Sequence, residues 1–439
     1  MDFMDQEAVA RLEGFFGRIG DILGNDERRA SFATYAMGIL ADGERKSVEP
    51  IAARACADPE RADAGHQRIL HFLSNANWGD HAVRQAAIRY ALGEITAREA
   101  IEAWILDDTG FLKQGTHSVG VQRQYTGSAG KITNCQLGVS LAVATRTEQL
   151  AVDFELYLPK CWAEDPARRA EAKIPDEVQF ETKPELGLKM VRRALAAGVP
   201  KGVVLADSAY GSSSEFRREL REELELEYAV GVNPATTVRL VGKSGKPRGN
   251  YQSLKKLAVQ LDEQKAFRRC TWRQGTKGPL TARFARRQVQ VSATETATLL
   301  IEWRDGENEP ANYFFISMAN IKSTKKLVRV VMQRWRIERT YEDLKGELGL
   351  DHYEGRRFRG WHHHVSVVLC CYAFVVAEKA RRFSPSARGS PRHEENPGPS
   401  RAALHRQLHH CPTCHRADPR DMASPMPDLP PDTRSAMTQ

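Results

Sequence analysis

The spacing of apolar residues divides the chain into a helical first part and a later part of strands and helices. From Glu7 to about Leu92, apolar residues recur every three or four positions with little enrichment in β-branched residues, which predicts amphipathic helices. After Glu102 the period changes, and short apolar runs bounded by polar residues predict strands. We therefore expect an all-α region first and a sheet that begins near Ala103.

Strands and helices follow one another in the next part in the manner of an α/β fold. We expect strands at "AWILDDTGF", "NCQLGVSLAVAT", "LAVDFELYLP", "GVVLADSAYG" and "YAVGV", and helices at "KPELGLKMVRRALAAG" and "SSSEFRRELREELELEY". Pro184 in the first turn and Gly198 at the end support the first of these helices. Three strands precede that helix, and the later strands are separated by helices, so the pattern predicts an α/β fold with a mixed sheet.

The remaining segments differ in composition. Between Asn233 and Asn320 the chain is strand-like and basic, which indicates an inserted β-rich subdomain, and helical periodicity returns at about Ser323. The apolar run Val365–Ala377 is too short to span a bilayer, so it predicts a core helix and no membrane association. Beyond Arg381 lie ten of the 21 prolines, which predicts a disordered tail.

Composition adds a broad class. With 439 residues, 41% of them apolar, the chain is long enough for two or more compact units with buried cores. Its net charge of +8 favours a polyanionic partner or an anionic surface, although charge for solubility explains it equally well. A further property has to decide between these two.

Cysteine usage and the first residues indicate a compartment. The eight cysteines show no regular framework, and a chain of this length does not need disulfides, so we expect a reducing cytoplasm. Acidic residues lie where a secretory leader would be hydrophobic, so no leader is expected. The pair Cys411 and Cys414 offers half a zinc site, and without a second spaced pair we interpret these cysteines as incidental.

Three acidic residues follow the ends of predicted strands. Asp107 and Asp108 close the first strand, and Asp207 closes the fourth. Ligands of open α/β sheets gather at the carboxyl ends of neighbouring strands, so one of the first pair should face Asp207 if these strands are parallel neighbours. Two carboxylates so close repel unless a cation lies between them, and hard divalent ions suit oxygen ligands. The structural alternative is that these are ordinary turn residues.

A further acid comes from the helix predicted after Ser323. Arg334, Glu338, Tyr341 and Lys345 are spaced four, three and four apart, so they share one helix face. Such a face presents an acid within a basic frame, which suits metal ions together with phosphate. An ordinary ion pair between Glu338 and Arg334 is the alternative. The combination of the acids, rather than any one of them, favours the functional interpretation.

These segments carry a resemblance to a known family. "LDDTGF", "LADSAYG" and "RWRIERTYEDLK" resemble the three signatures of bacterial insertion-sequence transposases of the DDE class, in the family-four superfamily and most closely its seven-hundred-and-one subgroup. The similarity extends to "RKSVEPIA", "HFLSNANW" and "KGELGLDHYEGRRFRGWHHH", and it covers most of residues 28–375. Each motif alone is weak, and their occurrence together in this order is specific.

The resemblance implies an RNase H-like catalytic core, interrupted by a β-rich insertion before the helix that bears the glutamate. It implies a catalytic and metal-binding triad of Asp108, Asp207 and Glu338. Asp107 is the rival for the first position, and Asp108 is preferred because a small hydroxyl residue follows it. Arg334, Glu338 and Lys345 match the family's tyrosine, arginine, glutamate, lysine signature, whereas Val331 stands where the tyrosine is expected.

The implied activity is cut-and-paste DNA transposition. Two Mg²⁺ ions, with Mn²⁺ as a substitute, would activate water and then a DNA 3′-hydroxyl for attack on phosphodiesters. The implied partner is double-stranded DNA, at the transposon ends and the target, bound by a homodimer in the bacterial cytoplasm at the nucleoid. The expected DNA-binding residues are Arg334, Lys345, Arg356, Arg357 and Arg359.

The expected organisation has five parts. They are a helical DNA-binding domain at residues 1–95, the first part of the core at 96–232, the β-rich insertion at 233–320, the second part of the core at 321–380 and the disordered tail at 381–439. Two other functions stay open at this point: a DNA-binding descendant that no longer cuts, and a metal-dependent nuclease without strand transfer.

Overall fold

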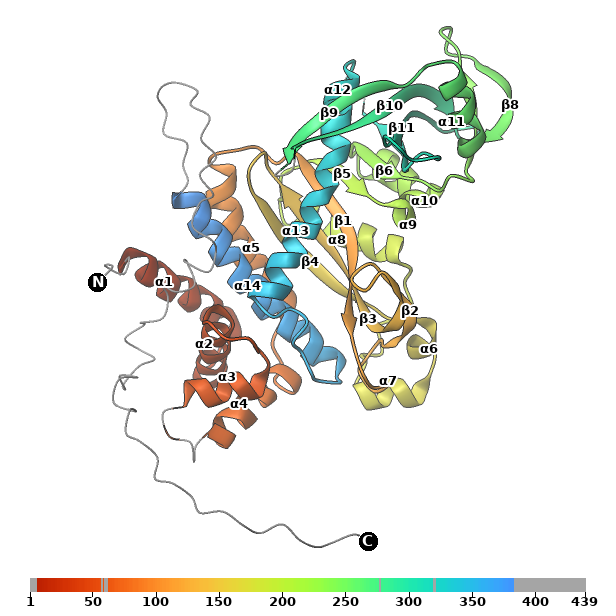
Figure 1. The fold of residues 1–439 in the computed structure, drawn as a ribbon. Coiled ribbons are helices and arrows are strands. Elements are labelled where there is room, and N and C mark those ends of the chain that lie inside the picture. Colours follow the sequence, from red (N-terminus) through yellow and green to blue (C-terminus); the bar gives the residue numbers. More distant parts are fainter. Residues whose placement is uncertain (1–5, 57, 59–61, 276–277, 319–320, 383–439) are drawn as a thin grey trace, which may run out of the picture.

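The computed structural model describes residues 6–56, 58, 62–275, 278–318 and 321–382 (Figure 1). The predicted disordered tail lies outside the described residues, apart from Arg381 and Arg382, which end the last helix. The pair Cys411 and Cys414 also lies outside them.

The first part of the chain is helical, as the apolar spacing predicts. Its helices are α1 (Gln6–Leu23), α2 (Asp26–Leu40), α3 (Val48–Ala55), α4 (Ala62–Ser74) and α5 (Asp80–Thr96). The side chain of Asn25 caps α2 by accepting a hydrogen bond of 2.8 Å from the Arg28 amide. These helices surround α14 (Phe358–Arg382), and their buried side chains belong to the same apolar core as α14 and one face of the sheet.

Helix α14 is the core helix expected from the apolar run. Among the described residues it is the one helix with the length and hydropathy to span a membrane, and that stretch is fully buried inside the protein. Its histidines serve packing. The ring of His363 stacks on Trp78 with centroids 3.7 Å apart, and Nδ1 of His364 lies 2.9 Å from the hydroxyl of Tyr35.

The strands join into one mixed sheet. They are β1 (Ala103–Leu112), β2 (Gln122–Thr126), β3 (Lys131–Ala144), β4 (Gln149–Tyr157), β5 (Val203–Ala206), β6 (Tyr228–Gly231), β7 (Thr237–Val241), β8 (Pro247–Ser253), β9 (Arg268–Gly275), β10 (Gly278–Gln290), β11 (Thr296–Trp303) and β12 (Asn312–Ser317). In the described part of the chain the order is β2-β3-β1-β5-β6-β12-β11-β10-β7-β8, with β4 beside β3 and β9 beside β10. β1 is antiparallel to β3 and parallel to β5, and β6 is parallel to β5.

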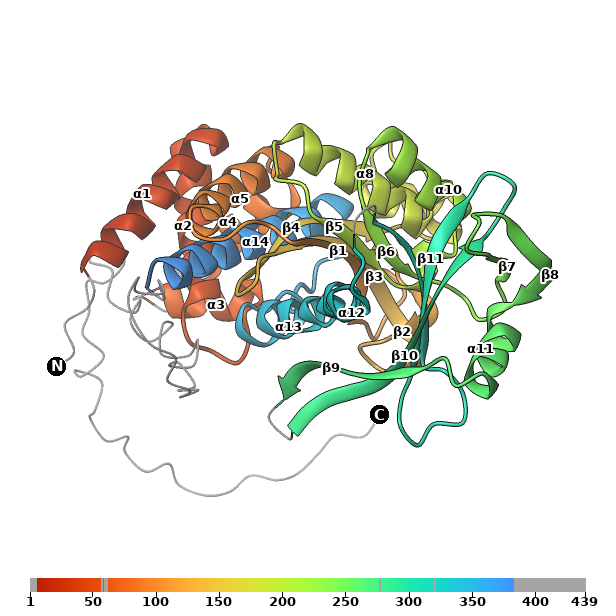
Figure 2. The ribbon, with the colours of Figure 1, turned by 90° about the horizontal axis from the view of Figure 1, so that it is seen from above.

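The central strands bury different side chains on their two faces. Ile105 and Leu205 share a core with Ile337 of α13 (Arg336–Glu342), on a face that α12 (Thr324–Val331) also covers. Leu106 points the other way, toward Gly187 of α8 (Lys183–Ala196). Figure 2 shows α12 and α13 on one side of the sheet, and α5, α8 and α14 on the other. We call these two sides the α13 face and the α8 face.

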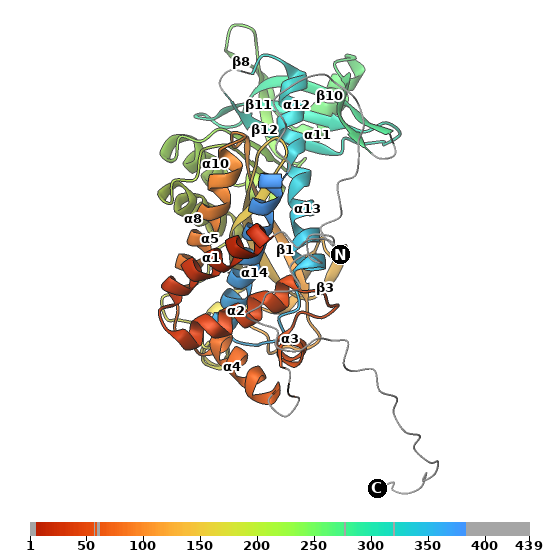
Figure 3. The same cartoon turned by 90° about the vertical axis from the view of Figure 1, so that its left-hand side faces the viewer.

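The basic segment after Asn233 is rich in strands, as expected, and it continues the central sheet. β12 pairs antiparallel with β6, so hydrogen bonding runs through the predicted boundary of the insertion. This part also contains α11 (Leu254–Glu263), a helix that the sequence pattern did not predict. The buried ion pair of Arg217 with Glu295 (2.7 Å) attaches it to the rest of the core, and Figure 3 shows it at one end of the molecule.

Some predicted elements differ in length. The helix expected from Ser212 to Tyr228 is shorter, with α10 (Ser214–Arg218) followed by a π-helical turn (Glu219–Glu223). The helix expected after Ser323 is α12 and α13 joined by a 3-10 turn (Met332–Trp335), with a π-helical turn (Asp343–Glu347) after α13. The short helices α6 (Lys160–Ala163), α7 (Pro166–Ala172) and α9 (Ser208–Gly211) were not predicted.

Candidate active site

Strand register brings two of the predicted acids to the same edge and the same face of the sheet. β1 and β5 are parallel neighbours in which Ala103 aligns with Val203 and Ile105 with Leu205. Side chains alternate between faces along a strand, so the next residues on the α13 face are Asp107 and Asp207. Asp207 follows directly from the end of β5. Asp107 lies in the middle of β1, which continues to Leu112, so the expectation that Asp107 and Asp108 close this strand is wrong.

Asp107 is held in a poorly solvated position. Its side chain is 15% exposed, and one carboxylate oxygen accepts a hydrogen bond of 2.7 Å from Nη1 of Arg334. Burial raises the pKa of Asp107 to about 7, against the attraction of Arg334, and the negative charge of Asp207 raises this pKa further.

Asp108 points to the opposite face. Its carboxylate accepts a hydrogen bond of 2.8 Å from Nζ of Lys183, at the start of α8. The sequence analysis preferred Asp108 over Asp107 because of the hydroxyl residue that follows it. Strand alternation instead separates Asp108 from the face that Asp107 shares with Asp207. The geometry therefore favours Asp107, rather than Asp108, as the partner of Asp207.

Helix α13 lies across this part of the α13 face. Arg334, just before the helix, contacts Asp107, and Tyr341 near its end places its hydroxyl 2.6 Å from Oγ of Ser140. Ser140 is the residue of β3 directly opposite Asp107. Glu338 lies between these two anchors on the same helix stripe, one turn beyond Arg334. The helix is therefore fixed at both ends so that Glu338 is near the strand that carries Asp107.

The carboxylates of Asp207 and Glu338 keep their capacity for ligands. Asp207 caps α9 by accepting a hydrogen bond of 2.9 Å from the Ala209 amide through one oxygen. Glu338 is exposed, and within the described part of the chain its carboxylate has no hydrogen bond or ion pair. Free oxygens of carboxylates at one sheet edge match the ligands that Mg²⁺ and Mn²⁺ prefer, so these residues fit a divalent cation.

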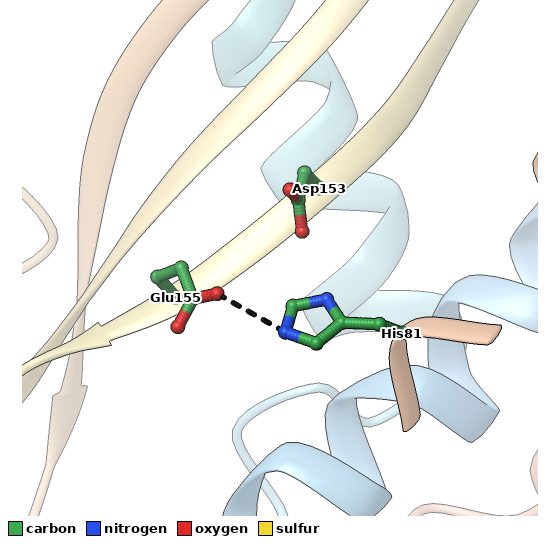
Figure 4. Close-up of side chains that lie close together, drawn as sticks. All are labelled: His81, Asp153 and Glu155. Atoms are coloured by element: carbon green, nitrogen blue, oxygen red, sulfur yellow. Dashed lines mark ion pairs between the residues drawn. The ribbon is translucent and has the colours of Figure 1, made fainter. Parts of the chain in front are cut away.

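In the described residues, only one group of three possible ligands has its atoms within 4.8 Å of one another, and it lies elsewhere. It consists of His81, Asp153 and Glu155, between α5 and β4 (Figure 4). Arg193 is 2.7 Å from both carboxylates, and Nη2 of Arg84 is 2.6 Å from Nδ1 of His81. Two guanidinium groups already balance the two acids, so we interpret this group as an ionic network within the core.

Asp107, Asp207 and Glu338 do not form such a group: in the described structure at least two of their ligand atoms lie more than 4.8 Å apart. Like charges without a cation between them are expected to stand apart, and Arg334 occupies the carboxylate of Asp107.

Comparison with known proteins identifies the family. A family model described as "DDE superfamily endonuclease" matches residues 18–279, which is more than half of the chain. The chain belongs to this family. The match includes β1 and β5 with their acids, and it ends before α13, so it does not reach Glu338.

One curated relative of this chain is named "Probable transposase for insertion sequence element IS701", from Microchaete diplosiphon. The two are 27% identical over 225 residues, which is 51% of this chain, and the chain spans about half (53%) of the relative's length. A solved synaptic complex of piggyBac transposase with hairpin DNA is 10% identical, with a TM-score of 0.44 over 88% of this chain and 70% of that one. A TM-score below 0.5 does not establish a shared fold.

The five predicted DNA-binding residues of this chain have different surroundings. Arg334 pairs with Asp107, and Nζ of Lys345 donates to the carbonyl of Gly110 (2.6 Å). Arg357 and Arg359 both donate to Asn75, between α4 and α5, and Arg356 is exposed. Arg334 and Lys345 thus hold elements of the site together in this structure, and a contact of any of the five with DNA stays a prediction.

Proposed function

We propose that the protein is a DNA transposase that cuts and joins DNA at the terminal inverted repeats of an insertion sequence. The observation that carries this proposal is the alignment of Asp107 with Asp207 under the helix that bears Glu338, in a chain of the DDE endonuclease family. The strand order β4-β3-β1-β5-β6, with three antiparallel strands followed by two parallel ones, supports an RNase H-like core.

The proposed metal ligands are Asp107, Asp207 and Glu338, with Asp107 in place of Asp108. Two divalent cations held there would activate the attacking oxygen and stabilise the leaving oxygen of a phosphodiester. The face supports the choice of Asp107, because Lys183 binds Asp108 from the α8 face, away from the face that Asp107 shares with Asp207.

The chain's own groups have separate tasks in this proposal. The amide of Ala209 fixes one oxygen of Asp207 and leaves the other free. The contact of Tyr341 with Ser140 holds the helix of Glu338 over β1. Arg334 offers a guanidinium group, which suits phosphate oxygens, beside the acids. DNA held along the carboxyl ends of β1 and β5 would therefore meet carboxylates and a cationic group together.

The proposal includes a homodimer on double-stranded DNA in the bacterial cytoplasm, because two ends must be cut in concert. The test uses donor DNA that carries the repeats found beside the gene, with Mg²⁺ and the full chain. Asp207→Asn should abolish cleavage and keep end binding, since asparagine also caps a helix. Asp165→Asn is the matched control, because Asp165 caps α7 in the same way and lies outside the site.

The products separate the alternatives. Joined products with wild-type protein support transposition, free cut ends indicate a nuclease, and binding without cutting indicates an inactive descendant. Cleavage by Asp207→Asn at the wild-type rate would refute the assignment of the site.

A further inference from the structure

The hairpin of β2 and β3 exposes an apolar pair. Among the described residues, Tyr125 (64%) and Ile132 (60%) are the most exposed large apolar side chains. They are directly opposite each other on the two strands, so they stand on the same face of the hairpin. Exposed apolar side chains that stand together on a folded surface indicate a contact with a partner.

The tip of this hairpin is packed against the candidate active site. Oγ of Ser128, in the turn, lies 3.1 Å from Oγ1 of Thr109 and 3.2 Å from Nζ of Lys345. Thr109 is two residues after Asp107 on β1, and Lys345 is two helical turns after Glu338. The hairpin is therefore tied both to the strand of one proposed ligand and to the helix of another.

Close packing at Gly110 holds the tip of the hairpin against β1. A Cβ atom at Gly110 would lie 2.1 Å from Oγ1 of Thr126, so the hairpin and β1 touch where only glycine fits. Thr126 is buried, although its neighbour Tyr125 is exposed. The apolar pair is thus presented by a rigid support beside the acids.

The charge around the pair favours a polyanion. Arg123 is exposed and shares the face of Tyr125, since it is two residues away on β2, and Lys131 is exposed at the turn. The chain has no Asp or Glu between Asp108 and Glu148, a stretch that includes the whole hairpin. A hairpin that combines an aromatic ring with cations and carries no acid of its own suits a nucleic acid strand.

We propose that the hairpin face formed by Arg123, Tyr125 and Ile132 binds the DNA strand next to the bond that is cut. The ring of Tyr125 stacks on a base that is unpaired at the DNA end, Ile132 packs beside that base, and Arg123 contacts a phosphate. Stacking on an aromatic ring accepts any base, so this contact is independent of sequence. The inference rests on the proposed function and adds the residues that hold the DNA end.

The test measures DNA affinity without cleavage, with the full chain in EDTA. The probes are two fluorescein-labelled duplexes that have the same labelled strand. One has a fully paired blunt end, and in the other the complementary strand is changed so that the last bases are mismatched. Tyr125→Ala should weaken binding of the mismatched duplex about tenfold and change the blunt duplex much less, whereas Tyr125→Phe should bind like the wild type. The matched control is Tyr251→Ala, because Tyr251 is also an exposed tyrosine (45%), on β8 away from the acids.

A second variant tests the charge. Arg123→Gln should lower the salt dependence of DNA binding by about one released counterion. This measurement tests the same face even if Tyr125→Ala fails to fold. Wild-type protein that binds neither duplex would overturn the proposed function and this inference together. Equal affinities of Tyr125→Ala and Tyr251→Ala for the mismatched duplex would overturn the inference alone. A changed oligomeric state of Tyr125→Ala with unchanged DNA affinity would also overturn the inference, because it would show that this face contacts a second copy of the chain.

Discussion

The neighbouring residues Asp107 and Asp108 allow a sharp test of the site. Both lie on β1, both accept a charge-assisted hydrogen bond, and their side chains are 15% and 16% exposed. They differ in the face to which they point. Asp107→Asn and Asp108→Asn are therefore matched variants that separate the two assignments of the first metal ligand.

The expected change in stability follows from the pKa of Asp107. Burial raises this pKa from 3.8 to about 7, so the unfolded protein releases the proton at lower pH than the folded protein does. The free energy of unfolding should therefore fall as pH rises from about 4 to 7, by about 4 kcal/mol at most, from about three pKa units of roughly 1.4 kcal/mol each. Asp107→Asn removes this loss, so the variant should be more stable than the wild type at pH 8.

Asp108→Asn should have the opposite effect. It removes the negative charge that Lys183 pairs with and should lower stability at pH 8 by about 1–3 kcal/mol. Urea unfolding at several pH values from 4 to 9 measures both variants against the wild type. A loss of stability at pH 8 in Asp107→Asn would show that the Arg334 pair outweighs burial, and it would refute the reasoning.

Addition of Mg²⁺ tests the metal directly. Binding to the folded state alone stabilises it by about 2.7 kcal/mol at a concentration of 100 times Kd. At pH 8 we expect this stabilisation in the wild type and in Asp108→Asn, and its loss in Asp107→Asn. If Mg²⁺ stabilises Asp107→Asn and no longer stabilises Asp108→Asn, the first metal ligand is Asp108 and the assignment of Asp107 is wrong.

Three further changes test polar contacts and a buried charge elsewhere in the fold. Tyr341→Phe removes the hydroxyl contact with Ser140; it should cost about 1 kcal/mol in urea unfolding and slow DNA cleavage with unchanged DNA affinity. Glu295→Ala leaves Arg217 buried without its partner and should lower the unfolding free energy by about 3–5 kcal/mol, measured with urea. Burial lowers the pKa of Lys46 to about 8, below its usual 10.5, so the unfolded state holds the proton more tightly. The free energy of unfolding should then rise as pH increases from about 8 to 10.5. Lys46→Met should lose that rise, measured by urea unfolding at several pH values in this range.

The sequence pattern predicts the central strands and their acids for a physical reason. A buried parallel strand is a short apolar run, and its carboxyl end is marked where the polar residues begin. β5 has this form, whereas β1 continues past its two acids to Leu112, because β3 pairs with it along this whole length. The apolar runs could still predict that Asp107 or Asp108 lies near Asp207 if the two strands are parallel neighbours. The choice within the pair could not, because it depends on the register of β1 with β5 and on which helix covers each face.

The hairpin and the extent of the sheet are tertiary features that leave little trace in the sequence. β2 reads "QRQYT", a polar segment whose strand conformation depends on pairing with β3. The continuity of the sheet depends on β12 pairing with β6, which are about eighty residues apart in the sequence. Local periodicity could predict a β-rich segment after Asn233, and it could not show that this segment extends the central sheet.

Arg334 shows why local spacing gave an ambiguous answer for Glu338. The two are four positions apart, so an ion pair along the helix was the simplest explanation of both. In the described structure Arg334 instead binds Asp107 of β1, across 227 positions of the chain, and no ion pair joins it to Glu338. Arg334 thus balances a buried acid, and the exposed carboxylate of Glu338 has no ion pair in the described structure. That arrangement brings no benefit to the isolated helix, and under the proposed function it leaves the carboxylate of Glu338 free to bind a divalent cation together with Asp107 and Asp207.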